Sequence, residues 1–87
     1  MKIHELKVWP EFYEALVEDD KCFEVRKNDR AFEVGDILHL REWDTILGKY
    51  TGAAAIAVVD YIMDLGEPFN VAPGYVVMGI SLLHDNE

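Results

Sequence analysis

The chain has 87 residues, of which 8 are basic and 17 are acidic, so its formal net charge is −9. This length predicts one domain, residues 1–87, with a modest core. The single cysteine excludes an internal disulfide framework. The negative charge disfavours non-specific binding to nucleic acid, because such binding depends on neutralising phosphates. Any binding to RNA must therefore use a local basic surface.

The chain shows no sign of secretion or membrane insertion. Its first residues, MKIHELKVWPEF, lack the apolar segment and the small-residue cleavage site of a signal peptide. The longest apolar run, GAAAIAVV, is far shorter than the roughly 20 residues that span a bilayer. We therefore expect a cytoplasmic protein without membrane association.

A strand and then a helix are expected first. Residues 2–8 alternate between polar and apolar with period two, which places the even positions, including His4, on one face of a strand. The period then changes to that of a helix, which is expected to begin at Pro10 and to end near Asp19 or Asp20. Its apolar face is formed by Phe12, Ala15 and Leu16.

Period two returns in KCFEVRK, residues 21–27, and predicts a second strand. Hydrophobicity favours Phe23 and Val25 as its buried face. Glu24 and Arg26 then share the opposite face.

Turn residues and alternating apolar residues divide the rest of the chain. We expect a turn at 28–30, a bend at Gly35 and Asp36, a strand over 37–42, a hairpin connection over 44–52, a strand over 53–64, a loop over 65–74 and a last strand over 75–83. The strand over 53–64 is expected to be buried on both faces near its middle. The chain is expected to have one or two helices and about five strands, without the regular alternation of strands and helices that is typical of βαβ units. This predicts a mainly β fold of the α+β class, folded as a small closed or partly closed barrel.

Half of the positive charge is concentrated in DDKCFEVRKNDR, residues 19–30. A guanidinium suits a phosphate or a base edge, and a nearby carboxylate can accept a hydrogen bond from an exocyclic amine. A Glu and an Arg two residues apart on one strand also fit an exposed ion pair, worth only about 0–1 kcal/mol. The candidate nucleic-acid-binding residues are Lys21, Glu24, Arg26 and, because of local charge alone, Lys27, Asn28 and Arg30.

This segment resembles the signature of ASCH (activating signal cointegrator homology) domains, a branch of the PUA-like superfamily. That signature runs Gly-x-Lys-x-x-Glu-x-Arg after a first helix; Lys21, Glu24 and Arg26 match it, and Asp19 replaces the glycine. HELKVWPEFYEAL, FEVRKNDRAFEVGDILHLREWD and GYVVMGISL are further similar to small ASCH-like proteins of bacteria and their phages. The resemblance implies a PUA-like β-barrel whose cleft, beside the first helix, binds RNA or a nucleotide through the three matching residues.

The resemblance also leaves an enzymatic alternative. Some ASCH relatives are amidohydrolases that remove the acetyl group of N4-acetylcytidine, with a lysine at the position of Lys21 and a threonine where this chain has Glu24. A carboxylate does not simply replace a hydroxyl nucleophile, because its attack gives an anhydride unless it acts as a general base on water. Cys22 is a possible substitute nucleophile, although a passive thiol is the simpler interpretation.

A protein-interaction domain is the third interpretation, because the outer side of the first helix is acidic and suits a basic partner. Its acidic residues are Glu11, Glu14, Glu18, Asp19 and Asp20.

The remaining polar and aromatic residues predict no metal site and no cofactor. The histidines at 4, 39 and 84 lack ligand spacing, and the one cysteine forms no pair. His4 is expected to be hydrogen-bonded at the barrel rim. Trp9 and Tyr75 are candidate stacking platforms for a base; core packing is expected for Trp9 and exposure for Tyr75.

Overall fold

The computed structural model describes residues 1–18 and 20–83, so Asp19 and the tail from His84 lie outside the described residues. The elements are β1 (Ile3–Val8), α1 (Pro10–Val17), β2 (Phe23–Lys27), β3 (Ile37–Asp44), β4 (Lys49–Asp64) and β5 (Tyr75–Leu82). The protein is therefore mainly β with one short helix in its described part, as the sequence predicts. No helix among these residues is long and apolar enough to cross a membrane, and the cytoplasmic location stays a prediction.

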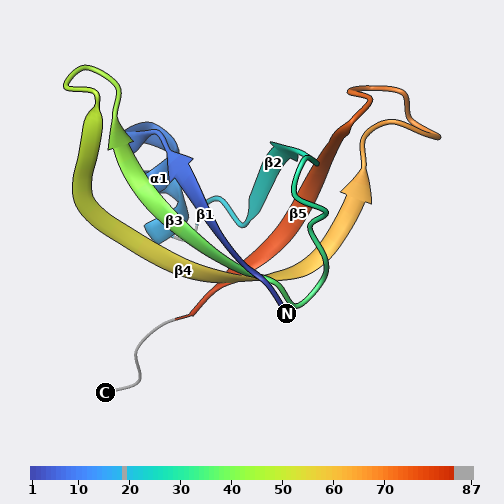
Figure 1. The fold of residues 1–87 in the computed structure, drawn as a ribbon, viewed down its shortest axis with the longest axis horizontal. Coiled ribbons are helices and arrows are strands. Elements are labelled where there is room, and N and C mark those ends of the chain that lie inside the picture. The colour runs from blue at the N-terminus through green and yellow to red at the C-terminus, as the bar shows by residue number, and fades with distance from the viewer. Residues whose placement is uncertain (19, 84–87) are drawn as a thin grey trace.

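The strands form a single curled sheet in the order β1-β3-β4-β5-β2. β1 pairs with β3 in parallel, and the other three pairings are antiparallel. The long β4 runs beneath the molecule in Figure 1 and rises at both ends, which gives the sheet the shape of a half-barrel. β1 and β2 are the two ends of the strand order, so the barrel is only partly closed.

Irregular pairing along β4 accounts for much of the curl. Its register shifts once against β3, between Arg41 and Trp43, and once against β5, between Val59 and Tyr61. Bulges of this kind bend a strand and increase its twist. Gly52 lies within the first irregular stretch and has a φ of 98°, a conformation that glycine adopts without steric cost.

The core fills the concave face of the sheet, beneath α1. Its residues are Leu6, Val8, Leu16, Phe32, Leu38, Leu40, Ala57, Val59, Val76, Met78 and Ile80. The predicted alternation of β1 is confirmed, because His4, Leu6 and Val8 are buried and the residues between them are exposed. The predicted burial of β4 on both faces is wrong: Ala57 and Val59 are its buried residues, on one face. Among the described residues, no helix lies over the convex face of the sheet (Figure 1).

The helix ends earlier than the sequence predicts, at Val17 with Glu18 as its C-cap. The amides of Asp20 and Lys21 both donate to the carbonyl oxygen of Ala15, at 2.9 and 3.0 Å, and turn the chain toward β2. Acidic side chains near a helix C-terminus oppose the negative end of the helix dipole, which disfavours further turns.

Candidate nucleic-acid interface

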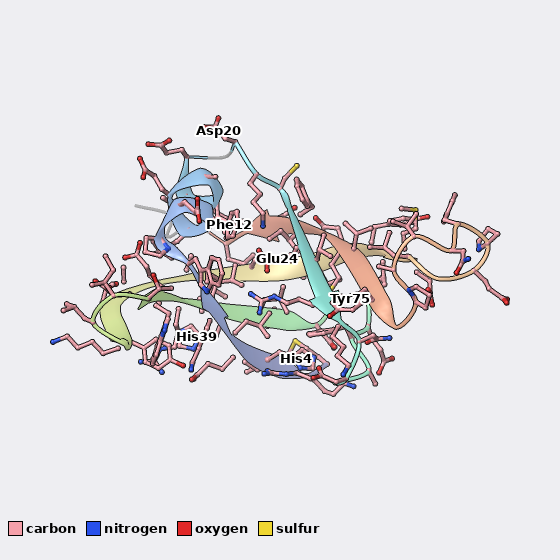
Figure 2. The ribbon with its side chains drawn as sticks, turned by 90° about the horizontal axis from the view of Figure 1, so that it is seen from above. His4, Phe12, Asp20, Glu24, His39 and Tyr75 are labelled. Carbon is pink, nitrogen blue, oxygen red and sulfur yellow. The ribbon has the colours of Figure 1, made fainter. Side chains whose placement is uncertain are left out.

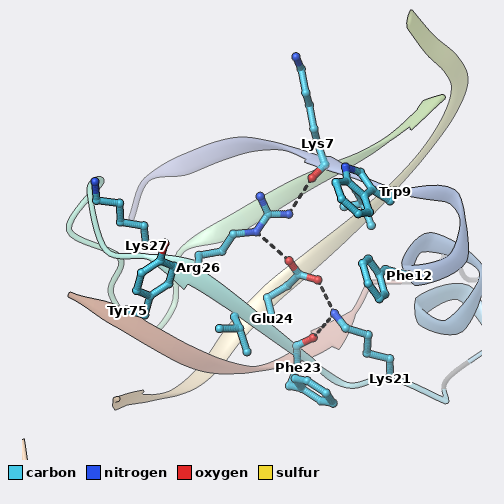
Figure 3. Close-up of a pocket in the computed structure, with 11 residues that line it drawn as sticks. Lys7, Trp9, Phe12, Lys21, Phe23, Glu24, Arg26, Lys27 and Tyr75 are labelled. Atoms are coloured by element: carbon cyan, nitrogen blue, oxygen red, sulfur yellow. Dashed lines mark hydrogen bonds and ion pairs between the residues drawn. The ribbon is translucent and has the colours of Figure 1, made fainter. Parts of the chain in front are cut away.

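A groove of about 590 Å³ lies along the seam between β1 and β2, beside the start of α1 (Figure 3). One bank consists of Lys7, Val8, Trp9 and Phe12. The other bank consists of Lys21, residues 23–27 and Tyr75. Seen from above in Figure 2, Glu24 lies between Phe12 and Tyr75. The groove therefore occupies the place where the half-barrel is open.

Three charged residues of the predicted signature meet at the floor of this groove. Lys21 Nζ lies 2.5 Å from Glu24 Oε1, and Arg26 Nε lies 2.9 Å from Glu24 Oε2. Arg26 Nη2 also donates to the backbone carbonyl of Lys7, at 2.7 Å, and so reaches across the seam to β1. Figure 3 shows this chain of contacts running from Lys21 through Glu24 and Arg26 to Lys7.

The predicted orientation of β2 is wrong, because its two faces are exchanged. Phe23 and Val25 are 45% and 47% exposed, whereas Glu24 is only 4% exposed. A buried carboxylate is tolerated when charged hydrogen-bond partners replace the water that it loses. Lys21 and Arg26 supply those partners, so the charged face of β2 turns inward and its apolar face helps to line the groove.

Aromatic rings stand on the two banks. Trp9 and Phe12 stack with a centroid separation of 6.1 Å and an interplanar angle of 19°, and Tyr75 lies on the opposite bank. The prediction that Trp9 packs in the core is wrong, since 54% of it is exposed. Its backbone carbonyl accepts the first helical bonds from Phe12 and Tyr13, which fixes it at the helix entry. The prediction that Tyr75 is exposed is confirmed.

The remaining predicted site residues divide into two groups. Lys27 lines the groove. Asn28 instead accepts a hydrogen bond from the Phe32 amide at 3.1 Å, and Arg30 donates to the Glu5 carbonyl at 2.7 Å. These two side chains fasten the loop after β2 and are not part of the groove lining.

Arginine side chains thus close the seam that backbone pairing leaves open. Glu5 and Lys7 lie two residues apart on β1, so their carbonyls point the same way, toward Arg30 and Arg26. The sequence carries no signal for this role, because the acceptors are backbone atoms that any residue would supply.

A second buried polar cluster lies away from the groove. His4 Nε2 is 2.9 Å from Asp36 Oδ2, and the His4 ring packs on Phe32. Burial alone would raise the pKa of Asp36. Hydrogen bonds from His4 and from the backbone N–H groups of Lys2 and Glu33 outweigh burial and lower that pKa to about 2. The expectation that His4 is a hydrogen-bonded histidine is confirmed.

The other side chains that could bind a metal or act as a nucleophile form no cluster among the described residues. Within residues 1–18 and 20–83, no group of three or more His, Cys, Asp or Glu residues is placed to hold a metal ion. Cys22 is exposed, and it is not among the residues that line the groove. His84 lies outside the described residues.

The fold and the groove define a class: a small, mainly β domain with a curled sheet and a basic, aromatic-lined groove at its open seam. Residues 3–80 match the family described as "Domain of unknown function (DUF3850)", and the chain belongs to this family. It is also similar to the "Uncharacterized 12.9 kDa protein in GpA 3'region" of Escherichia phage P2, with 38% identity over 66 residues. That match covers 76% of this chain and 59% of the length of the phage protein.

Proposed function

We propose that the groove between β1 and β2 binds a nucleotide unit of RNA, with a base against its rings and a phosphate near its cations. The ring faces of Trp9, Phe12 and Tyr75 suit any base, because every base has a π-face. Lys21, Arg26 and Lys27 provide positive charge on the opposite bank from Trp9. Rings and cations in one groove are the usual means of holding single-stranded RNA.

The orientation of Arg26 is the observation that supports this proposal most. Glu24 holds its Nε and the Lys7 carbonyl holds one Nη2 hydrogen, so the plane of the guanidinium is fixed from two sides. Within the described residues, its Nη1 group has no hydrogen-bond acceptor and is available to a ligand in the groove. A guanidinium group that is already held in position loses little rotational freedom when a phosphate or a base edge binds to it.

The charge of the groove also favours an anionic ligand. Lys7, Lys21, Arg26 and Lys27 line it, with Glu24 as the one carboxylate among its lining residues. The rest of the protein is strongly acidic, because the whole chain carries −9. A basic groove on an acidic protein directs a phosphate to one place and repels it elsewhere.

We further propose that the half-barrel is a PUA-like barrel of the ASCH type. The support is the clustering of Lys21, Glu24 and Arg26 in a groove beside the first helix, where the resemblance implies a cleft. An experimental structure should superpose on ASCH domains with these three side chains at the signature positions. If the strands superpose but the three side chains do not, the ASCH assignment is wrong.

The experiment that tests RNA binding is an NMR titration of isotope-labelled protein with uridine 5′-monophosphate and octauridylate at low salt. Amides of residues 21–27 and the indole N–H of Trp9 should shift and saturate. Trp9→Leu should weaken binding by about 1–3 kcal/mol, the value of one stacked base. Lys27→Gln should weaken it about two- to fivefold through lost charge.

The matched control is Lys49→Gln, which removes one exposed positive charge outside the groove lining and should leave binding unchanged. If neither ligand moves any groove signal at low salt, the RNA proposal is wrong.

The same protein then tests the two alternatives. Release of acetate from N4-acetylcytidine that is lost in Lys21→Ala indicates an amidohydrolase. Capture of a basic protein that depends on Glu11 and Glu14 indicates an interaction domain.

A further inference from the structure

Lys7 connects the groove to a second group of cations and rings on the outer face of the sheet. Its backbone carbonyl accepts the Arg26 hydrogen bond inside the groove. Its Nζ lies 3.8 Å from the ring centroid of Trp43, which is not a groove residue. In Figure 3 the Lys7 side chain points away from the groove floor. One residue therefore borders both surfaces.

The second group, which we call the outer cluster, consists of Lys7, Arg41, Trp43 and Tyr50. Trp43 and Tyr50 are cross-strand partners whose rings meet edge to face, with centroids 4.9 Å apart. The Arg41 guanidinium carbon lies 3.6 Å from the centroid of Tyr50. Lys7 and Arg41 are partners in the β1–β3 register, so two cationic heads lie side by side over two rings.

The outer cluster lies around the edge of β1 from the groove, because neighbouring residues Lys7 and Val8 both line the groove but point to opposite faces of the strand. His4, Leu6 and Val8 turn to the core, so Lys7 turns outward. On β2 the outward residues Phe23 and Val25 line the groove. A chain bound in the groove can therefore continue over the edge of β1 and reach the outer cluster without crossing the core.

The cations of the outer cluster are only partly neutralised. Arg41 Nη1 lies 3.0 Å from Glu5 Oε1, in a half-exposed ion pair. Lys7 has no carboxylate partner among the described residues. A ring face holds a cation in place by its quadrupole without cancelling its charge. The Lys7 ammonium and the Arg41 guanidinium thus remain available to an anion, and the Glu5 carboxylate competes with that anion for Arg41.

We propose that the outer cluster binds a backbone phosphate of the same RNA whose base occupies the groove. The ligand is then a single-stranded oligonucleotide that crosses the edge of β1, and a mononucleotide fills only part of the site. This inference rests on the function proposed above for the groove.

The two tryptophans of the chain report on the two surfaces separately. Trp9 lines the groove and Trp43 belongs to the outer cluster, and each gives one indole N–H signal, assigned through Trp→Phe variants. Uridine 5′-monophosphate should shift the Trp9 signal alone. Octauridylate should shift both signals with one common dissociation constant, lower than that of the mononucleotide.

Charge variants of the outer cluster give the second readout. Arg41→Gln should weaken octauridylate binding about three- to tenfold and reduce its salt slope by about 0.7, the contribution of one phosphate contact to a single strand. Glu5→Gln should strengthen octauridylate binding, because it releases Arg41 from its ion pair. Mononucleotide binding should be unchanged in both. Lys49→Gln is the control: Asp44 and Lys49 are partners one position from Trp43 and Tyr50, so they lie on the opposite face of the same hairpin.

The outcomes separate this inference from the groove proposal. If both ligands shift Trp9 with equal affinity, Trp43 does not respond and the Arg41 and Glu5 variants have no effect, the outer cluster is a structural feature and the inference is wrong. In that case the groove proposal stands. If neither ligand shifts Trp9, the groove proposal fails. An octauridylate effect on Trp43 alone would contradict a site shared with the groove.

Discussion

At the scale of single residues, Glu24 organises the candidate site. Its side chain is almost completely buried, yet both of its oxygens have a cationic partner, Lys21 on one side and Arg26 on the other. Removing a carboxylate from such a set leaves two partly buried cations without compensation, which costs more than an exposed ion pair is worth. Glu24 thus fixes the positions of the cations that we propose as ligands for RNA.

We expect Glu24→Gln to lower the free energy of unfolding by about 3 kcal/mol, as measured by urea denaturation. The matched control is Glu33→Gln, which breaks an exposed ion pair with Lys2 at 3.5 Å and should cost less than about 1 kcal/mol. Equal costs for the two variants would show that burial of Glu24 is not important for stability.

Asp36 should make the protein sensitive to acid. In the folded protein the pKa of Asp36 is about 2, below its ordinary value of 3.8. As the pH falls, Asp36 is therefore protonated in the unfolded chain before it is protonated in the folded one. The stability it provides, about 2 kcal/mol, is complete above pH 4 and is lost as the pH falls from 4 toward 2. Unfolding measured at a series of pH values should show this loss. In Asp36→Asn stability should already be lower at pH 7, and the decline below pH 4 should be shallower.

At the scale of secondary structure elements, the seam between β1 and β2 distinguishes this fold from a closed barrel. The strands are held by Arg26 and Arg30, which donate to carbonyls of β1, rather than by a backbone ladder. Side chains are longer than the spacing between paired strands, so this form of closure leaves room for the groove. The edge of β1 is also partly protected from pairing with another chain.

Arg30→Gln should therefore loosen β1 without unfolding the protein. We expect faster amide hydrogen exchange in β1 and in residues 28–36, and a loss of about 1–2 kcal/mol, at or below the lower end of the value of a hydrogen bond to a charged group because this bond is exposed to solvent. Lys27→Gln, three residues away and without a side-chain hydrogen bond to β1 among the described residues, should leave exchange in β1 unchanged. The seam model is contradicted if both variants behave alike.

At the scale of the whole molecule, the distribution of charge is more informative than its sum. The chain has only eight basic residues against seventeen acidic ones, but four of the eight basic residues line one groove. Long-range repulsion from the acidic surface therefore opposes any extended phosphate backbone, while the groove attracts a short segment.

This distribution predicts that RNA binding is sensitive to salt, but less so than binding through a large basic surface. With Lys21, Arg26 and Lys27 in the groove and with Lys7 and Arg41 in the outer cluster, the slope of log K against log salt should lie between about −2 and −4 for octauridylate. Fluorescence anisotropy over a series of salt concentrations measures this slope. A slope near −10 would show that a far larger surface contacts phosphate than the groove and the outer cluster provide.

The amino-acid sequence alone determined most of the secondary structure. Period-two alternation placed β1 and its buried face correctly, and Pro10 marked the start of α1. The spacing of Glu24 and Arg26 placed both on one face of a strand, and the resemblance to the ASCH signature added Lys21 to them; in the structure both cations contact Glu24. Local interactions of this kind are encoded within a few residues.

Only the tertiary structure decided which way β2 faces and where its arginines reach. Hydrophobicity assigned Phe23 and Val25 to the core, but burial depends on the side to which the sheet curls, and that curl arises from β4 far along the chain. Likewise Arg26 and Arg30 find backbone acceptors on β1, 19 and 25 residues away in sequence. Contacts that depend on the path of the whole sheet leave no pattern in a short segment, so the closure of the seam by arginines, the exposure of Trp9 and the outer cluster emerged from the fold alone.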